Sequence, residues 1–442
     1  MDVSRRSLML GSLALGVSAA LAACTPRGTD PGIRSRVPDR PTSFLRTSWS
    51  ADPFAFGSYS YLAPSDLGSS ARELLAAPVG RLFFAGEATS TSAPATTTGA
   101  WQSGERAAAQ VTDTTGPVIV IGAGFAGLAA ARALVAAGRE VTVVEGRDRI
   151  GGRAHTVPFA GGVADLGASW IHGTADNPIT LLAADAGTAL IPFDYDNQIG
   201  ADEDALDWLE EITWEASDED DPEARPMSDL PPTTLTAGQT WAVAVEVAGE
   251  YGADPDRLAI AALDEGDEQR GGDALLSDGY GALVSEAAAG LDIRTGWPVT
   301  RITQDAAGVT ITADDGQTLS GAVAIVTVPL GVLQAGAIAF DPPLPDEKTA
   351  AISALGMGLL DKLWLAFDEV FWDPDVDVIN IVDPENPGAW PFWVNGYKAF
   401  GLPVLLGFAG GAAAERNARL TDDELVASAM TTLRTAFSPG SR

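Results

Sequence analysis

The clearest hydrophobic pattern in the chain is a run of four apolar residues, Val118 to Ile121, followed by a glycine-rich turn and an alanine-rich segment through Ala137. A continuous apolar run bounded by turn residues is typical of a strand that is buried on both faces. A second apolar run ends at Val144. The pattern predicts a strand, a tight turn, a helix and a second strand, in that order.

Two further stretches have strand periodicity. Short β-rich runs within 293–328 are separated by glycine-containing turns, which predicts a meander. Later in the chain, Leu363, Leu365 and Phe367 alternate with other residues, so they share one face of a strand and Lys362 lies on the other.

The segment 202–223 is strongly acidic, with 12 acids among its 22 residues, and it carries Leu206, Leu209 and Ile212 at helical spacing. This pattern favours an amphipathic helix with a solvated face. The alternative is an acidic rim that attracts amines.

Charge and rare residues narrow the chemistry. Sixty acidic residues against 27 basic ones give a net charge of −33, which excludes a basic nucleic-acid-binding surface and enriches cations such as protonated amines near clefts. With one cysteine, Cys24, and two histidines, His155 and His172, the chain can form no intramolecular disulfide or cysteine-rich metal site. We therefore expect no metal centre, and chemistry that depends on an organic cofactor.

Residues 1–24 have the pattern of an export signal. Arg5 and Arg6 form a twin-arginine motif ahead of an apolar stretch that is too short for an ordinary membrane span. The stretch ends in Leu21-Ala22-Ala23-Cys24, which resembles a bacterial lipobox, so we expect Cys24 to be lipidated. The prediction is twin-arginine export to the cell envelope and a lipid anchor on the outer face of the cytoplasmic membrane. The alternative is a plain signal that is cleaved elsewhere. Residues 25–48 are predicted to be a linker.

The turn after the first strand has the spacing of a dinucleotide-binding motif. Gly122 permits the tight turn, Gly124 lets a pyrophosphate approach the helix N-terminus, and Gly127 lets helix and strand pack closely, with Ala123 between the first two glycines. Glu145 follows the second strand, where a carboxylate accepts both ribose hydroxyls.

A second glycine-rich run follows immediately. Gly151 and Gly152 let the backbone approach another phosphate, while Arg147 and Arg153 supply positive charge. The alternative for this run is a polar surface turn.

Together with the stretch 165–173, AspLeuGlyAlaSerTrpIleHisGly, these motifs resemble the flavin-containing amine oxidases, a family that includes monoamine oxidases, polyamine oxidases and lysine-specific histone demethylases. The resemblance implies FAD as the cofactor. The loop that it places beside the flavin ring consists of Gly167, Ala168, Ser169 and Trp170. It also implies that His172 lies at the substrate site, whereas the alternative for His172 is a structural histidine.

Two blocks that close the chain in that family stand here before the glycine turn. They are 49–61, with TrpSerAlaAspPro and GlySerTyrSerTyr, and 82–109, with PheAlaGlyGlu. We interpret this order as a circular permutation with its splice at 112–116. The rival interpretation is a damaged or misassembled gene.

The resemblance assigns roles within these blocks. Gly86 and Glu87 would meet the phosphate and ribityl region of the cofactor. Gly99 and Ala100 would open a helix whose N-terminal amides point at the flavin ring.

The resemblance also implies what lines the substrate pocket. Tyr59 and Thr96 match the two walls of the family's aromatic cage next to the flavin. Because threonine is not aromatic, half of the cage is absent, and a typical monoamine is disfavoured as the substrate. Ser58 stands where monoamine oxidases carry the cysteine that holds the flavin, so the FAD should be noncovalent.

Two residues of the later strands complete the implied site. Lys362 would contact flavin N5 through a water and assist oxygen reduction or imine hydrolysis; the alternative is an exposed strand lysine. The backbone of Val299 would meet adenine; the alternative is an ordinary strand valine.

The fold expected from these observations is α/β: a Rossmann-type FAD-binding domain in permuted order and a second α+β substrate domain. The predicted FAD domain comprises 49–178 and 271–333. The predicted substrate domain comprises 179–270 and 334–442.

The expected function is FAD-dependent oxidation of a primary or secondary amine, polyamine-like or monoamine, to an imine that hydrolyses to an aldehyde, with O₂ reduced to H₂O₂. The partners would be a small amine and O₂. Two alternatives stay open: an L-amino acid oxidase, which needs an arginine for the substrate carboxylate, and a flavin-binding protein without catalysis.

Overall fold

The computed structural model describes residues 36–111, 114–216, 221–230, 232 and 234–437. The predicted signal segment 1–24, including Cys24, lies outside the described residues, as do residues 25–35 of the predicted linker and part of the splice at 112–116. Within the described residues, no helix combines the length and apolar composition that crossing a membrane requires.

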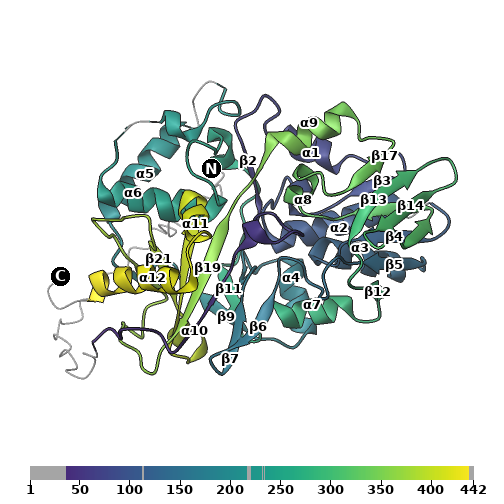
Figure 1. Ribbon diagram of the computed structural model, residues 1–442. Coiled ribbons are helices and arrows are strands. Elements are labelled where there is room, and N and C mark those ends of the chain that lie inside the picture. Colours follow the sequence, from purple (N-terminus) through teal and green to yellow (C-terminus); the bar gives the residue numbers. More distant parts are fainter. Residues whose placement is uncertain (1–35, 112–113, 217–220, 231, 233, 438–442) are drawn as a thin grey trace, which may run out of the picture.

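One half of the molecule is built on a parallel sheet, on the right in Figure 1. Its strands are, in order, β12 (Ile293–Arg294), β5 (Val141–Val144), β4 (Val118–Ile121), β16 (Val323–Val326) and β3 (Leu82–Phe84). Apolar residues from both faces of β4, β16 and β3 are buried, which is why these three strands are continuous apolar runs. The predicted strand, turn, helix and strand are confirmed.

Helices cover one face of the parallel sheet and an antiparallel meander covers the other. The helices are α2 (Thr97–Val111), α3 (Phe125–Ala136), α4 (Pro178–Asp185) and α7 (Tyr280–Ala288). The meander runs in the order β15 (Thr318–Gly321), β14 (Val309–Ala313), β13 (Val299–Gln304) and β17 (Ala339–Asp341). The predicted meander is confirmed for β13 to β15, whereas the two ends of the predicted range, β12 and β16, belong to the parallel sheet. Strand β17 joins the meander as a parallel neighbour of β13.

The other half contains a six-stranded mixed sheet. Its strands are β1 (Ser43–Arg46), β19 (Leu360–Ala366), β22 (Val404–Gly410), β21 (Phe392–Asn395), β20 (Val378–Asn380) and β10 (Gln198–Ile199). The helices α11 (Gly411–Asn417) and α12 (Asp422–Phe437) lie in this half (Figure 1). Leu363 and Leu365 pack with α12 on one face of β19, and Trp364 packs on the other, as the alternation predicts.

The acidic segment forms α5 (Glu203–Ala216), which buries Leu206 and Leu209 against α6 (Ala237–Val243) and so confirms the amphipathic helix. The helix α6 continues into a π-helix, η5 (Ala244–Gly249).

The remaining elements are short. They are α1 (Ser70–Ala76), α8 (Leu330–Gln334), α9 (Asp346–Ala354), α10 (Gly396–Phe400), η2 (Trp49–Ala51), η3 (Glu87–Thr89), η4 (Met227–Asp229), η6 (Ile260–Asp264), the pairs β2 (Ser60–Leu62) with β18 (Leu355–Met357) and β6 (Thr156–Phe159) with β7 (Gly162–Asp165), and the sheet β8 (Trp170–Ile171), β11 (Asp273–Leu276), β9 (Leu190–Phe193).

Strand pairing crosses four of the predicted boundaries. The end of the predicted linker contains β1, which pairs antiparallel with β19 from Ser43 opposite Ala366 to Arg46 opposite Leu363. The boundary at 333 separates β17 from its partner β13, and the boundaries at 178 and 271 separate β9 from β11. In each case, the strand pairs with a segment that the sequence pattern had placed in the other domain or outside both.

The segment ahead of the glycine turn is an integral part of the parallel half. Strand β3 pairs parallel with β16, which in turn pairs parallel with β4. Helix α2 packs beside α3 in the same hydrophobic core. The fold therefore places 82–111 next to the nucleotide turn, although it precedes that turn in the chain.

Candidate active site

A cavity of about 610 Å³ extends from the carboxyl ends of the parallel strands to the six-stranded sheet. One end, which we call the nucleotide end, is lined by the turns after β4 and β5. The other, which we call the substrate end, is lined by η5 and by residues of β21 and β22. All but three of the predicted site residues line this cavity; the exceptions are Ala123, Gly127 and Gly99.

Two glycines of the turn have different roles: Gly124 leaves space beside the cavity, and Gly127 allows close packing of the helix. A Cβ on Gly124 would meet only the carbonyl oxygen of Gly151, at 3.9 Å, so the space beside Gly124 is open to the cavity. A Cβ on Gly127 would lie 1.9 Å from the carbonyl oxygen of Gly122, so Gly127 serves helix packing. Gly122 has a φ of +110°, a backbone conformation that favours glycine.

Glu145 ends β5 at the cavity with its carboxylate held in place. One oxygen accepts from the backbone N–H of Ala123 and the other from that of Arg147, both at 2.9 Å. Ala123 therefore orients the acid without lining the cavity. The guanidinium of Arg147 is 2.8 Å from a carboxylate oxygen of Asp52, so its charge is paired with that acid.

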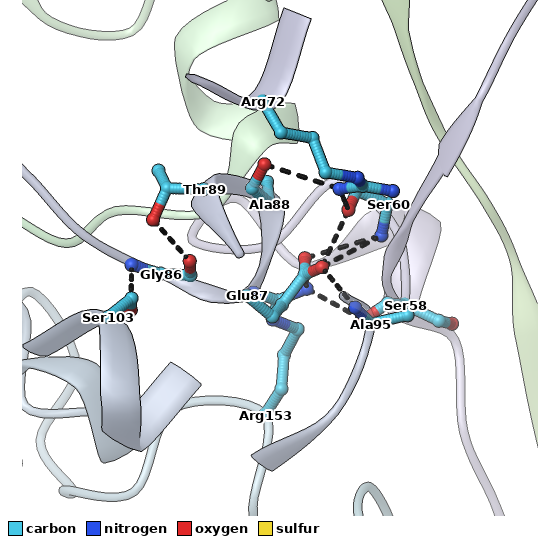
Figure 2. A network of polar contacts seen from close by, with 10 residues as sticks. All are labelled: Ser58, Ser60, Arg72, Gly86, Glu87, Ala88, Thr89, Ala95, Ser103 and Arg153. Atoms are coloured by element: carbon cyan, nitrogen blue, oxygen red, sulfur yellow. Dashed lines mark hydrogen bonds and ion pairs between the residues drawn. The ribbon is translucent and has the colours of Figure 1, made fainter. Parts of the chain in front are cut away.

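Figure 2 shows the network around Glu87, which binds three segments of the chain together. The carboxylate accepts from Arg153 at 2.9 Å, from the hydroxyl of Ser60 at 2.6 Å and from the amide of Ala95 at 3.0 Å. Burial raises the pKa of Glu87, but the nearby charges of Arg153 and Arg72 outweigh it and lower the pKa overall.

This network gives Glu87 a structural role as well as a place in the cavity wall. Its carboxylate accepts from Arg153, Ser60 and the backbone, so it holds the cavity wall together. Arg153 likewise shares its charge with Glu87. Gly86 keeps its predicted place, since a Cβ there would have no atom within 4 Å.

The start of α2 is held by hydrogen bonds within the chain. The amide of Gly99 donates to the hydroxyl oxygen of Thr96 at 3.0 Å, and the amide of Ala100 donates to the Thr96 carbonyl at 3.1 Å. Ala100 lines the cavity, as predicted, with its amide already hydrogen-bonded. A Cβ on Gly99 would lie 1.9 Å from the Ala93 carbonyl oxygen, so this glycine serves packing.

The loop predicted to pass beside the flavin meets Lys362 in the middle of the cavity. The Lys362 ammonium donates to the Gly167 carbonyl at 2.5 Å and to the Ser169 hydroxyl at 2.6 Å. It lies 5.6 Å from the centre of the Trp170 ring and 5.5 Å from that of Phe408. Burial lowers the pKa of Lys362 to about 8. The interpretation as an exposed lysine is wrong.

The substrate end of the cavity brings Tyr59 and His172 together with acids that the sequence interpretation missed. The Tyr59 hydroxyl donates to the Gly249 carbonyl of η5 at 2.8 Å. Glu246 and Glu250, on η5 and just after it, line the same region. Burial, followed by the charge of Glu250, raises the pKa of Glu246 to about 8.

A sequence signal for these acids exists. Glu246 and Glu250 stand four residues apart in the largely apolar stretch 241–251, where a carboxylate on a buried helix has to face either a partner or a cavity. A π-helix is a frequent feature of functional sites.

The nucleotide end fits a dinucleotide such as FAD. Gly124 leaves room for a phosphate, and the fixed Glu145 carboxylate offers acceptor capacity to ribose hydroxyls. The indole N–H of Trp170 is buried in the cavity wall without a hydrogen-bond acceptor among the described residues. A bound group that carries acceptor atoms would satisfy it.

Comparison with known proteins agrees with this geometry. A family model described as flavin containing amine oxidoreductase matches residues 20–112, 125–207 and 227–441. Polyamine oxidase 4 of Oryza sativa subsp. japonica is 36% identical over 353 residues, which are 72% of each chain. Polyamine oxidase 2 of Arabidopsis thaliana is 34% identical over 344 residues, 69% of each chain. The fold resembles wild-type putrescine oxidase bound to putrescine, with a TM-score of 0.56 and 20% identity over 74% of this chain and 82% of that one.

Proposed function

Because the chain belongs to the flavin-containing amine oxidoreductases and is an FAD-dependent amine oxidase, we propose that its substrate is a linear diamine or polyamine. The observation that carries this proposal is the pair of acids Glu246 and Glu250 in the wall of the substrate end of the cavity. The names of the relatives, polyamine oxidases, support the same substrate class.

The physical argument rests on the second nitrogen of such a substrate. The nitrogen next to the reacting carbon has to be neutral, whereas a distant ammonium keeps its charge and needs an anionic partner once water is excluded. The half-buried carboxylates of Glu246 and Glu250 repel each other when both are ionised. This repulsion adds to the effect of burial and lets Glu246 hold its proton to about pH 8. An ammonium bound near them would relieve this repulsion.

Bound FAD would supply the two-electron oxidation chemistry that couples conversion of the amine to an imine with reduction of O₂ to H₂O₂, and the imine would hydrolyse in water to an aldehyde and ammonia or an amine. Gly122, Gly124 and Glu145 would hold its nucleotide half. The ring of Tyr59 is fixed by its hydrogen bond to Gly249 and forms one wall of the substrate pocket.

The two alternative functions are disfavoured. An L-amino acid oxidase needs a cation for the substrate carboxylate, but Arg147 and Arg153, the arginines that line the cavity, are paired with Asp52 and Glu87. A flavin-binding protein without catalysis does not account for Glu246, Glu250 and the buried Lys362 in the wall of one cavity.

Replacing both acids tests the substrate class. In Glu246→Gln/Glu250→Gln we expect KM for a diamine such as putrescine to rise about tenfold, equivalent to about 1.4 kcal/mol, because the ammonium loses its anionic partners. KM for butylamine, which has the same length and no second charge, should change little. Steady-state peroxide assays with both substrates measure the difference.

The pH dependence supplies a second readout. Glu246 loses its proton as pH rises through about 8, so the ratio of the diamine KM to the butylamine KM should fall between pH 7 and 9 in every form that keeps Glu246 and Glu250, and not in the double variant. Glu215→Gln, a change on the exposed side of α5, is the matched control. Equal rises in both KM values would sink the substrate proposal while leaving amine oxidation intact.

We also propose twin-arginine export and lipidation of Cys24, supported by the motif at residues 4–8 and by the apolar stretch that ends in Leu21-Ala22-Ala23-Cys24. Expression of the full chain in a bacterium with a twin-arginine system should yield membrane-associated enzyme. Cys24→Ser should release it, and a soluble full chain would contradict the anchor.

The circular permutation is likewise a proposal. It is supported by the place of β3 and α2 beside β16 and α3, ahead of the glycine turn in sequence. A relinked chain that starts near residue 116, runs to 437 and continues with 36–111 should fold and bind flavin. Failure of this relinked chain to fold would argue against the permutation.

A further inference from the structure

His172 does not stand alone at the substrate end of the cavity. Its Nδ1 lies 2.7 Å from an oxygen of Asp273, the first residue of β11, and the other oxygen of that carboxylate accepts from the Gly173 amide at 3.0 Å. The His172 side chain lines the cavity and is 37% exposed, whereas that of Asp273 is 3% exposed. The acid therefore lies behind the imidazole.

The Asp273 carboxylate is ionised and firmly placed. Burial raises its pKa, but interaction with His172 and the hydrogen bonds from His172, Gly173 and Tyr195 lower it overall. An ionised carboxylate can only accept hydrogen bonds, so Nδ1 of His172 has to carry the proton that points at it. In the neutral ring the lone pair is then on Nε2.

We propose that Asp273 is a positioning residue that fixes the tautomer of His172 so that Nε2 accepts the proton of the substrate ammonium. The inference deepens the proposed amine oxidation and rests on it. In this step an N–H bond of the ammonium breaks and an Nε2–H bond forms, while the electron pair stays on the substrate nitrogen. The resulting imidazolium is balanced by Asp273 and later releases the proton to water.

Other titratable groups share this cavity with His172 and Asp273. They are Tyr59, Tyr195, Tyr251, Glu210, Glu246, Glu250 and Lys362, together with Glu87, Glu145, Arg147, Arg153 and Asp314. Tyr195 hydrogen-bonds Asp273, and burial raises its pKa well above the usual value, so it remains a neutral donor. His172 is the histidine that lines this cavity, and the buried carboxylate of Asp273 contacts its Nδ1 and so orients its ring.

The tautomer can be measured without turnover. The chain has two histidines, so holoenzyme labelled with ¹⁵N-histidine and free of any affinity tag should give two ring spin systems, assigned with His155→Gln. We expect His172 to be protonated at Nδ1. In Asp273→Asn the amide can donate to Nδ1, and the proton should move to Nε2. Asp278→Asn, the same change at a nearby exposed acid bonded to Ser277 and Thr188, should leave His172 unchanged.

Kinetics then separate a positioning role from a structural one. Asp273→Asn should lower kcat/KM about 10²-fold at pH 7, the size of a general-base contribution. In a His172→Gln background, Asp273→Asn should add less than about threefold, because the two residues act as one unit. Between pH 9 and 10.5 the loss should shrink, because the amine then arrives without its proton.

Two outcomes would overturn the inference. An unmodified enzyme protonated at Nε2 of His172 would refute the assigned tautomer whatever the substrate is. Additive losses in the double variant would make Asp273 an independent structural residue. If no amine is oxidised by any form, the proposed function fails, and the ring spectrum still decides the role of Asp273.

Discussion

Replacing Gly124 by valine should give a folded protein that has lost its flavin. The Cβ position of Gly124 faces open cavity, where only the Gly151 carbonyl lies within 4 Å, so the added methyl groups do not disturb protein packing. They would occupy the space that a pyrophosphate needs beside the N-terminus of α3. We expect FAD affinity to fall at least about 10²-fold, equivalent to about 2.7 kcal/mol.

The measurement is the ratio of flavin absorbance to protein absorbance after purification, with circular dichroism as the check on folding. Gly127→Ala is the contrasting control, because its Cβ would lie 1.9 Å from the Gly122 carbonyl oxygen and should destabilise the fold itself. A Gly124→Val protein that retains a full complement of flavin would place the nucleotide elsewhere.

Replacing Lys362 by methionine should slow reoxidation of the reduced flavin by O₂ about 10²-fold, the loss typical of removing one preorganised charge stabiliser. The Lys362 ammonium is held by Gly167 and Ser169 beside the loop predicted to contact the flavin, where it can stabilise negative charge. Anaerobic reduction of the flavin by the amine should fall less than tenfold. Stopped-flow absorbance measures the two half-reactions separately.

The rate of flavin reoxidation should also depend on pH, in a direction that the pKa of Lys362 sets. The pKa of Lys362 is lowered to about 8, so its positive charge is present below pH 8 and lost above it. Reoxidation in the unmodified enzyme should therefore slow as pH rises through 8, and the methionine variant should show no such step. Lys398→Met, a change at a lysine paired with Asp377, is the control. An unchanged reoxidation rate in Lys362→Met would contradict the proposal that Lys362 assists the reaction of the reduced flavin with O₂.

The parallel half of the fold could be predicted because its signals are local. The run 118–121 is apolar at every position, since both faces of β4 are covered, and the glycines that follow satisfy steric needs within a few residues of each other. The face of Lys362 also followed from strand alternation. In these cases the residues that determine the local structure are neighbours in the sequence.

Boundaries failed where the decisive partner is far away in the chain. Ser43–Arg46 is a short strand whose pairing partner, β19, lies more than 300 residues later, so composition alone suggested a linker. Strand β17 was separated from β13 for a similar reason. Neither segment is long or regular enough to identify itself without its neighbour.

The functional site, like the fold, was predictable where the signals are local and unpredictable where the partners are distant in the chain. The sequence by itself determined which residue types are available for the nucleotide. Motif spacing made Glu145 a candidate, and the resemblance to the amine oxidase family made Lys362 and His172 candidates. Only the tertiary structure decided what each side chain does: the Glu87 carboxylate is taken by Arg153, and the Gly99 amide by Thr96.

The acids of the substrate end depended entirely on the fold. Asp273 lies behind His172, and Glu246 and Glu250 face the cavity, because β11 pairs with β8 and because η5 packs beside Tyr59. Hydrogen bonds and charge pairs act over a few ångströms in space, whereas their partners here are up to about 200 residues apart in the chain. Local patterns therefore fixed the elements and the cofactor turn, and only long-range packing decided which charged groups meet the substrate.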